Sequence, residues 1–413
     1  MNKRVAITGL GFCGAVGNGV AALRHALKSG ESGLKPLTLF DSELAGEYPV
    51  GQYAGDLAQD FRTRKRPLKP RELARLSRSD LLAMVATAEC LSHARLSAAE
   101  LGAAGAGVYL GQSVCGTYNS ELRYIECVRE AAQRGHASSR NLSALYVHEG
   151  ANSCDAIARE FELAGPFASF MTACSSGANA IGLAAQQISA GKADVMVAGG
   201  ADSLSRIAYL GFHCLGVMSP EGPRPFDAHR KGMCVGEGAG MLVLESEAHA
   251  TQRRAKILGW LSGYGHTCDS HHLTAPHPEG TGAIGAMRLA LADARLGAAD
   301  IGYVSAHGTG TLDNDKVESI AIARVFGERA VPVSSTKRLF GHTLAASGAI
   351  KAIICLLALQ DKSLPANFGL NTPQDNALDL LAQTRSAPKL KHAISNSFGF
   401  GGNNAALVFS EGP

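Results

Sequence analysis

The sequence predicts an α/β protein built from two successive halves of similar make-up. Short apolar runs, typical of buried strands, alternate with longer runs in which apolar residues recur at helical spacing. This alternation covers Pro166 to Gly200 and begins again at Ile257. No Pro- or Ser-rich linker divides the chain, so we expect a duplicated fold with one shared interface. We place the halves at residues 1–250 and 251–413.

The expected elements follow from these patterns in order. In the first half, apolar runs predict strands at 5–8, 106–111, 166–173, 195–200 and 240–245. Ala- and Leu-rich periodicity predicts helices at 81–96 and 176–190. Residues 118–160 are expected to form helical connections. Residues 37–80 show no regular pattern. In the second half we expect strands at 257–263, 303–306, 332–335, 393–396 and 405–409, and helices at 283–296, 316–326 and 344–359.

Composition excludes several classes of protein. The chain has 413 residues, of which 46% are hydrophobic and 18% charged, enough for a sizeable core. A net charge of +3 is too small to indicate nucleic-acid binding, and no run of about 18 apolar residues predicts a membrane span. The ten cysteines include no C-x-x-C pair, which favours reduced thiols in a cytoplasmic protein. Glycines break the apolar part of the N-terminus, so we expect a strand and loop there instead of a signal peptide.

Two further patterns have weak functional interpretations. Gly9-Leu-Gly-Phe-Cys-Gly14 matches the dinucleotide fingerprint G-x-G-x-x-G, but a loop at 28–36 stands where the confirming second strand should follow. We therefore reject a nucleotide site. A basic run over 62–78, which includes Lys65 and Lys69, predicts either a solvated face or a docking surface for an acidic partner.

Cys174 lies where a strand is expected to turn directly into a helix. Main-chain N–H groups and the positive helix end favour a thiolate at such a place. A packed, unreactive cysteine is the alternative, because free cysteines are among the most buried residues.

Two histidines in the second half occupy comparable places. His307 and His342 each follow an expected strand and are bracketed by Gly and Thr. Ligands of open α/β sheets sit beyond the carboxyl ends of strands, so these imidazoles and Cys174 should face one cleft. A thiol and two imidazoles there suit acyl transfer through a thioester.

Two loops remain. The His, Cys and Asp residues of 266–277 match no standard zinc spacing, and we expect no metal. The glycine-dense turn 398–404 predicts a tight hairpin, or a mobile aromatic gate at Phe400 whose N–H groups stabilise an oxyanion.

Together the motifs resemble the β-ketoacyl-acyl carrier protein synthases, the elongating condensing enzymes of the thiolase superfamily. The resemblance runs through nearly the whole chain in the family's order: Val5-Ala-Ile-Thr-Gly-Leu-Gly, Thr172-Ala-Cys-Ser-Ser-Gly, Val197-Ala-Gly-Gly-Ala-Asp, Arg224-Pro-Phe-Asp, Gly236-Glu-Gly-Ala-Gly, Ala306-His-Gly-Thr-Gly-Thr, Ser334-Ser-Thr-Lys, Gly341-His-Thr and Asn396-Ser-Phe-Gly-Phe-Gly-Gly. It implies a five-layered α-β-α-β-α thiolase fold and a dimer, either a homodimer or a ketosynthase heterodimer.

The resemblance also implies a mechanism, a decarboxylative Claisen condensation. Cys174 would take an acyl chain from acyl carrier protein, and His307 and His342 would assist loss of CO₂ from a malonyl unit. The carbanion would then attack the Cys174 thioester. No resident cofactor is implied, because 4'-phosphopantetheine arrives on the carrier protein.

Further roles come from the same matching of motifs. Lys337 would be the active-site lysine, with Glu318 in its charge network, and the N–H groups of Cys174 and Phe400 would form the oxyanion hole. Three threonines would hydrogen-bond the pantetheine arm: Thr274, Thr309 and Thr311. Asp269 and His272 would belong to a gating loop, and the carrier protein would bind to Lys65, Lys69 and Arg206.

The sequence departs from the family pattern at two positions. Asn403 stands where the turn usually has Thr, and Lys351 stands where typical fatty-acid enzymes have a glutamate. These departures and Ser175-Ser176 leave a specialised polyketide or polyene pathway open beside fatty-acid synthesis. The alternative function is a chain-length-factor-like or heterodimer partner subunit. Chain-length factors lack the nucleophile, whereas this chain has Cys174.

Overall fold

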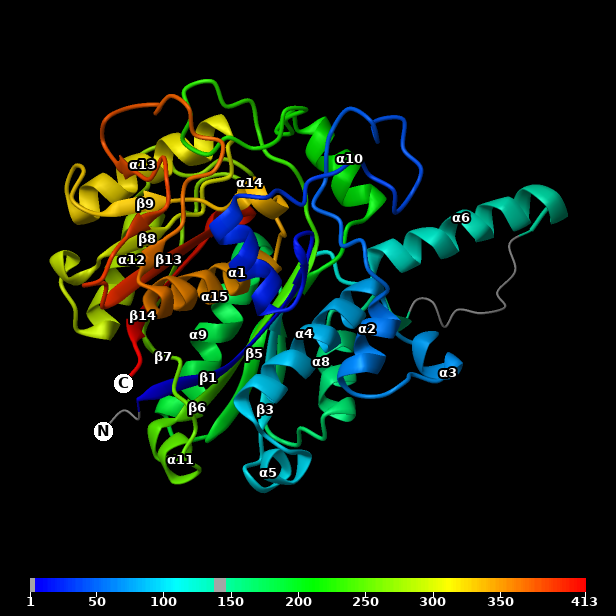
Figure 1. Ribbon diagram of the computed structural model, residues 1–413. Coiled ribbons are helices and arrows are strands. Elements are labelled where there is room, and N and C mark those ends of the chain that lie inside the picture. Colours follow the sequence, from blue (N-terminus) through cyan, green and yellow to red (C-terminus); the bar gives the residue numbers. More distant parts are fainter. Residues whose placement is uncertain (1–3, 137–145) are drawn as a thin grey trace.

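A mixed sheet runs through the whole molecule in the computed structural model, which describes residues 4–136 and 146–413 (Figure 1). Its strand order is β11-β9-β8-β13-β14-β7-β1-β6-β5-β3-β4. The strands are β1 (Val5–Gly14), β3 (Gly107–Gly111), β4 (Phe167–Phe170), β5 (Val195–Asp202), β6 (Gly238–Ser246), β7 (Gly259–Cys268), β8 (Tyr303–Ser305), β9 (Pro332–Ser334), β11 (Asp379–Leu380), β13 (His392–Gly399) and β14 (Asn403–Glu411). The short β2 (Gly17–Asn18) pairs with β1, and β10 (Ser363–Leu364) pairs with β12 (Arg385–Ser386).

The two halves of this sheet repeat one topology. The order β4-β3-β5-β6-β1 in the first half corresponds to β9-β8-β13-β14-β7 in the second. In each half the first two of these pairings are parallel and the last two antiparallel. Antiparallel pairing of β1 with β7 joins the halves. The predicted duplication is thereby confirmed.

Helices form three layers around the two half-sheets. On the outer side of the first half, α4 (Arg78–Ala94) and α8 (Ala151–Glu160) bury one apolar core. Between the halves lie α9 (Ser176–Ser189) and α15 (Ala346–Asp361), which share a second core with strands of both halves. On the outer side of the second half, α12 (Thr281–Ala294) and α13 (Leu312–Phe326) cover a third core. The order of layers is α-β-α-β-α, as predicted.

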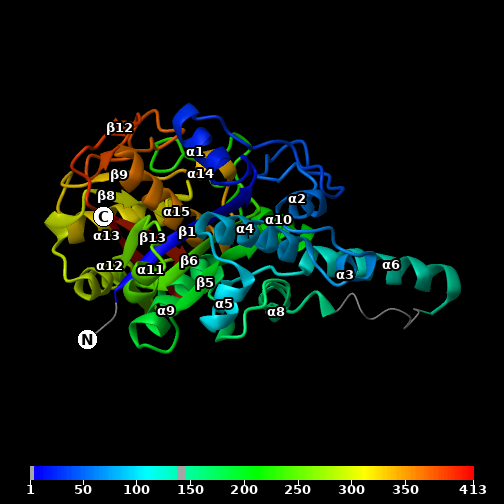
Figure 2. The ribbon, with the colours of Figure 1, turned by 60° about the horizontal axis from the view of Figure 1, so that its bottom comes forward.

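The remaining helices lie around this framework. They are α1 (Val20–Ser29), α2 (Leu57–Arg64), α3 (Pro70–Leu73), α5 (Ala98–Ala103), α6 (Thr117–Arg134), α10 (Arg206–Cys214), α11 (Glu247–Gln252) and α14 (Lys337–Phe340). Both views show α6 extending away from the body of the molecule (Figures 1 and 2). Within the described residues, no helix is long and apolar enough to cross a bilayer.

The expectation that residues 37–80 are wholly irregular was wrong. Asp56 caps α2 by accepting hydrogen bonds from the N–H groups of Ala58 and Gln59. Only Leu57 and Phe61 of α2 are buried, so the helix carries too few apolar residues for a visible period.

The expected strand at 166–173 exists, but it is not buried. β4 is the last strand of the sheet, and Phe167 is 62% exposed. Apolar residues on this strand therefore face outward along an open sheet edge, an arrangement that periodicity cannot distinguish from burial.

The glycines of the rejected nucleotide motif lie inside β1, not in a phosphate-binding turn. A Cβ on Gly11 would overlap the carbonyl oxygen of Ala86 in α4, and one on Gly9 would overlap that of Cys90. These glycines let α4 pack directly on the strand.

Candidate active site

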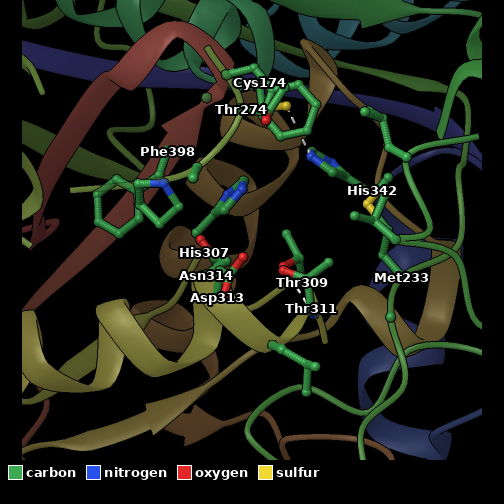
Figure 3. A pocket seen from close by; sticks show the side chains of 18 of the residues that line it. Cys174, Met233, Thr274, His307, Thr309, Thr311, Asp313, Asn314, His342 and Phe398 are labelled. Atoms are coloured by element: carbon green, nitrogen blue, oxygen red, sulfur yellow. Dashed lines mark hydrogen bonds between the residues drawn. The ribbon is translucent and has the colours of Figure 1, made fainter. Parts of the chain in front are cut away.

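One pocket of about 360 Å³ gathers most of the predicted site residues (Figure 3). It lies beyond the carboxyl ends of β4 and β8, where the chain leaves the sheet. The predicted residues in its lining are Cys174, Asp269, Thr274, His307, Thr309, Thr311, His342 and Phe400.

Cys174 lies in a tight turn between β4 and α9. Ala173 adopts a positive φ of 51°, which turns the chain sharply before the helix begins. The Ser176 hydroxyl fixes this turn by accepting a hydrogen bond from the Thr172 N–H (2.9 Å) and donating one to the Ala173 carbonyl (2.6 Å). The predicted strand-to-helix position of the cysteine is confirmed.

Two glycines allow Cys174 and His342 to lie close together. The Gly177 N–H of α9 donates to the Ala345 carbonyl at 3.1 Å, and a Cβ on Gly177 would lie 2.5 Å from that oxygen. A Cβ on Gly348 of α15 would likewise lie 2.7 Å from the Ala178 nitrogen. The two central helices can therefore begin side by side, and Cys174 Sγ lies 3.1 Å from His342 Nε2.

The hydrogen-bond partner of His342 defines its tautomer. Nδ1 accepts a hydrogen bond from the Leu344 N–H at 3.3 Å, which assigns the proton to Nε2 in the neutral ring. The His307 ring lies edge-on, with ring centroids 5.2 Å apart. Burial lowers the pKa of both imidazoles well below the usual value. Both rings are therefore neutral at pH 7, and His342 presents an N–H donor to the pocket.

The expectation of a thiolate is not met in the free protein. Burial raises the pKa of the Cys174 thiol to about 11. The Lys337 ammonium and the main-chain N–H groups of Phe400 and Cys174 act in the opposite direction, but burial outweighs them. The sulfur is therefore protonated at pH 7, and the His342 Nε2–H group lies 3.1 Å from it.

Glu318 and Lys337 hold the main chain of His307. The two carboxylate oxygens of Glu318 accept the N–H groups of His307 and Gly308, each at 2.7 Å. The Lys337 ammonium donates to the His307 carbonyl. Burial lowers the pKa of Lys337 to about 8, and the Glu318 charge opposes this shift. The structure thus brings both predicted charged residues to the catalytic histidine candidate.

Phe400 lies directly beside Cys174. It begins the short helix η3 (Phe400–Gly402) that joins β13 to β14, where Gly401 and Gly402 both have positive φ. A Cβ on Gly399 would lie 3.0 Å from the Cys174 nitrogen, so glycine allows this close approach. The N–H groups of Phe400 and Cys174 both act on the sulfur, consistent with the predicted oxyanion hole.

The loop at 269–277 packs against the Phe400 turn. Asp269 accepts hydrogen bonds from Asn404 Nδ2 (2.8 Å) and the His277 N–H (3.0 Å). The exposed His272 folds back on its own loop, where Nδ1 accepts the Thr274 N–H at 3.1 Å. In the described part of the chain, no three His, Cys, Asp or Glu side chains are grouped as metal ligands.

The predicted pantetheine-binding residues converge on the pocket. The hydroxyls of Thr309 and Thr311 lie 2.8 Å apart in the turn after β8. Thr274 enters the same pocket from the loop after β7 (Figure 3). Polar groups from two loops therefore line the pocket near Cys174.

The predicted carrier-protein residues do not lie in this pocket. Lys65 and Lys69 are exposed on the α2–α3 segment, and Lys65 lines a separate hollow against Phe161. Arg206 begins α10, whose other end supplies Phe212 to the active-site pocket.

Both interpretations of the basic run overlooked the ion pairs that its arginines form. Arg66 binds Glu72 (3.0 Å) and Glu160 (2.5 Å), and Arg78 binds the buried Glu237 (2.5 Å). These arginines hold the segment to the body of the protein.

Three contributors were not assigned roles from the sequence. The Phe398 ring lies 5.9 Å from His307, and the Phe212 ring lies 5.8 Å from Phe400. The buried Asp202 accepts the N–H groups of Val114 (2.8 Å) and Ala345 (2.9 Å), which ties β5 to the start of α15. Asp202 is the last residue of the motif Val197-Ala-Gly-Gly-Ala-Asp, so the sequence offered a signal for it. No motif surrounds Phe212, and the sequence does not distinguish it from an ordinary apolar residue.

Comparison with known proteins identifies the family. Residues 2–250 match the N-terminal domain of β-ketoacyl synthases, and residues 258–371 match the C-terminal domain. The chain is 36% identical to nodulation protein E of Rhizobium meliloti (strain 1021) over all of both chains. It is 34% identical to 3-oxoacyl-[acyl-carrier-protein] synthase 2 of Staphylococcus aureus (strain COL) over 99% of both.

Solved structures agree with this assignment. A chain of the ishigamide ketosynthase/chain length factor superposes with a TM-score of 0.92 at 30% identity over 100% of both chains. The ketosynthase (ApeO) in complex with its chain length factor (ApeC) from Xenorhabdus doucetiae gives 0.86 at 32% identity over 99% of this chain and 98% of that one. The chain therefore belongs to the β-ketoacyl synthases and is a condensing enzyme of the acyltransferase type.

Proposed function

We propose that Cys174, His307 and His342 carry out a decarboxylative condensation between a Cys-bound acyl chain and a malonyl thioester. The convergence of the sulfur and two neutral imidazoles in one pocket carries this assignment. No resident cofactor is needed, because the pantetheine thiol arrives on an acyl carrier protein and lies along Thr274, Thr309 and Thr311.

The first half-reaction loads the enzyme. The Cys174 sulfur attacks the acyl thioester carbon, and its proton ends on the carrier thiolate that leaves. The oxyanion rests on the N–H groups of Cys174 and Phe400, and the carrier thiol leaves with a proton. Phe400 must move for the chain to pass, and Gly401 and Gly402 give its turn the freedom to do so.

The second half-reaction forms the carbon–carbon bond. His307 and His342 donate N–H groups to the malonyl thioester carbonyl while the carboxylate leaves as CO₂. The resulting enolate attacks the Cys174 thioester carbon, and the sulfur leaves as thiolate and regains a proton. Neutral imidazoles suit this step, because it requires hydrogen-bond donors at an oxygen that gains negative charge.

We also propose that the enzyme works as a pair with a second ketosynthase-fold chain. β4 leaves one edge of the sheet open, with Phe167 62% exposed and Met171 62% exposed. The projecting α6 presents Tyr124 (71% exposed) and Val128 (50% exposed), one helical turn apart. The ApeO relative was solved with its chain length factor. The leading arrangement is therefore a heterodimer in which this chain supplies the nucleophile.

Acyl loading from a panel of carrier proteins tests the substrate class. Intact-protein mass spectrometry should show one acyl group added to Cys174. Saturated chains of ordinary length support fatty-acid synthesis, whereas polyunsaturated or aryl starters support a polyene or polyketide pathway. Co-purification from native cells separates a heterodimer from a homodimer. Failure of every acyl donor to load Cys174 would contradict the proposal.

A further inference from the structure

The main chain on the two sides of His342 is held by different parts of the fold. The His342 N–H donates to the Cys234 carbonyl at 2.7 Å, and the His342 carbonyl accepts the Gly236 N–H at 2.9 Å. Beyond the histidine, Leu344 has a positive φ of 49°, a conformation that residues other than glycine rarely adopt. Such a backbone persists only where surrounding contacts hold it, so the turn after His342 requires a restraint of its own.

The buried carboxylate of Asp202 supplies this restraint. Asp202 is the last residue of β5, and its Oδ2 accepts the Ala345 N–H at 2.9 Å. Ala345 follows Leu344 directly and caps the start of α15. The Leu344 N–H in turn donates to Nδ1 of His342 at 3.3 Å. Two successive main-chain N–H groups therefore connect the carboxylate to the His342 ring.

The same carboxylate also holds the loop that follows β3. Oδ1 accepts the N–H groups of Ser113 (3.1 Å), Val114 (2.8 Å) and Cys115 (3.2 Å), and Oδ2 accepts the Ser113 hydroxyl (2.5 Å). Burial raises the pKa of the Asp202 carboxyl, and these hydrogen bonds act in the opposite direction. The two oxygens have different partners, because Oδ1 binds the loop alone while Oδ2 binds both the loop and the His342 turn.

Cys174 is held by other contacts. The Ser176 hydroxyl fixes its turn through two main-chain hydrogen bonds. Burial and, to a smaller extent, the negative charge of Asp202 raise the pKa of the Cys174 thiol, so neutralising that charge should not slow attack by the sulfur. A displaced 342–345 turn should therefore affect the step that uses the His342 imidazole more than it affects acyl loading.

We propose that Asp202 is a positioning residue for the condensation half-reaction: its hydrogen bond from the Ala345 N–H holds the turn in place and thereby keeps the Nε2–H of His342 directed into the pocket. Asp202 does not line the pocket, so it acts through His342 and not on the substrate. The inference rests on the proposed condensation, in which His342 donates this N–H to the thioester carbonyl of the malonyl unit.

Asp202→Asn removes this hydrogen bond selectively. An amide has a single acceptor oxygen, and the three N–H groups of the loop favour that oxygen at the Oδ1 position. The amide nitrogen then faces the Ala345 N–H and cannot accept a hydrogen bond from it. Condensation should fall roughly 10- to 100-fold through misplacement of His342, while acyl loading of Cys174 should change less than about twofold. Each half-reaction is assayed separately on protein whose circular dichroism matches that of the wild type.

The His342 ring gives a readout that does not depend on activity. Nitrogen NMR of protein labelled at the histidine rings reports which ring nitrogen carries the proton, and the His342 signals are assigned by their loss in His342→Gln. The wild type should show a protonated Nε2 and an unprotonated Nδ1 that accepts a hydrogen bond. Asp202→Asn should show a second tautomer, because the Leu344 N–H no longer fixes the ring.

Ser113→Ala is the matched control. It removes the hydroxyl that shares Oδ2 with the Ala345 N–H but leaves that N–H bound, so condensation and the His342 signals should stay as in the wild type. In a second variant, lactic acid incorporated in place of Ala345 replaces the N–H by an ester oxygen with Asp202 intact. This variant should reproduce the loss in Asp202→Asn and decides the matter if that protein does not fold.

Three results would overturn the inference: unchanged condensation by Asp202→Asn, unchanged His342 ring signals in that protein, or an equal loss of condensation in Ser113→Ala. Absence of condensation in the wild-type enzyme would instead contradict the proposed function. In that case the ring signals still show whether Asp202 holds His342, because they require no substrate.

Discussion

Glu318 and Lys337 hold opposite ends of the same residue. Glu318 accepts the His307 N–H at 2.7 Å, and Lys337 donates to the His307 carbonyl. One carboxylate and one ammonium from different helices thus fix the backbone that carries the His307 imidazole. This arrangement explains why two charged groups are buried beneath a pocket that they do not line.

Glu318→Gln should weaken this hold. An amide has one acceptor oxygen, so the N–H of His307 or Gly308 loses its partner, at a cost of about 1–3 kcal/mol in the free energy of unfolding. Condensation should fall more than acyl loading of Cys174, because the loading step does not use His307. Urea denaturation and separate assays of the two half-reactions measure these effects. The exposed Glu328→Gln is the control, and equal losses in both half-reactions would contradict the assignment.

Gly11→Ala should destabilise the fold strongly. The added methyl group would overlap the Ala86 carbonyl and force α4 away from β1, which we expect to cost about 3 kcal/mol or more. Gly102→Ala, in α5, is a matched control, since a Cβ there has no heavy atom within 4 Å. Denaturant midpoints distinguish the two. Tolerance of Gly11→Ala would show that this glycine is not required for packing.

Protonation of the histidines should make stability depend on pH. The pKa of His342 is lowered in the folded protein, so below the ordinary value of about 6.5 the unfolded chain binds more protons. The free energy of unfolding therefore falls as pH decreases, by about 1.4 kcal/mol per unit for each such histidine. His342→Gln should show a shallower slope between pH 7 and 5.5, whereas the exposed His271→Gln should keep the wild-type slope. Identical slopes in all three proteins would refute this.

Phe167→Glu should disrupt pairing at the open sheet edge. The side chain is 62% exposed in the single chain, so a charge there costs the fold little but would be buried by a partner strand. Light scattering should show a lower mass with unchanged circular dichroism. Leu289→Glu, 50% exposed on α12, serves as control and should retain the assembled mass. A Phe167→Glu protein that still assembles would place the interface elsewhere.

Much of the fold is predictable because local patterns and final environments agree. β5 is buried along its whole length, and its sequence is correspondingly apolar. Cys174 and His307 were predictable because they follow β4 and β8 closely, where α/β sites form; the sequence did not show that α14 (Lys337–Phe340) separates His342 from β9. The exposure of β4 was not, because only the strand order makes it an edge.

Other features depend on tertiary context alone. Phe212 reaches the pocket through the placement of α10, which no local pattern encodes. The protonated state of Cys174 follows from how deeply the turn is buried, whereas the sequence shows only the helix that follows it. The presence of a lysine at position 351 was visible in the sequence, but its burial on α15 was not.

Loading of Cys174 is the measurement that tests the account most directly. Wild-type protein and Cys174→Ala are each incubated with an acyl-loaded carrier protein and examined by intact-protein mass spectrometry. We predict one acyl adduct on the wild type, mapped to Cys174 by peptide analysis, and none on the variant, which should also form no condensation product. An equal adduct on Cys174→Ala, or condensation at the wild-type rate, would contradict the assignment of this residue as the nucleophile.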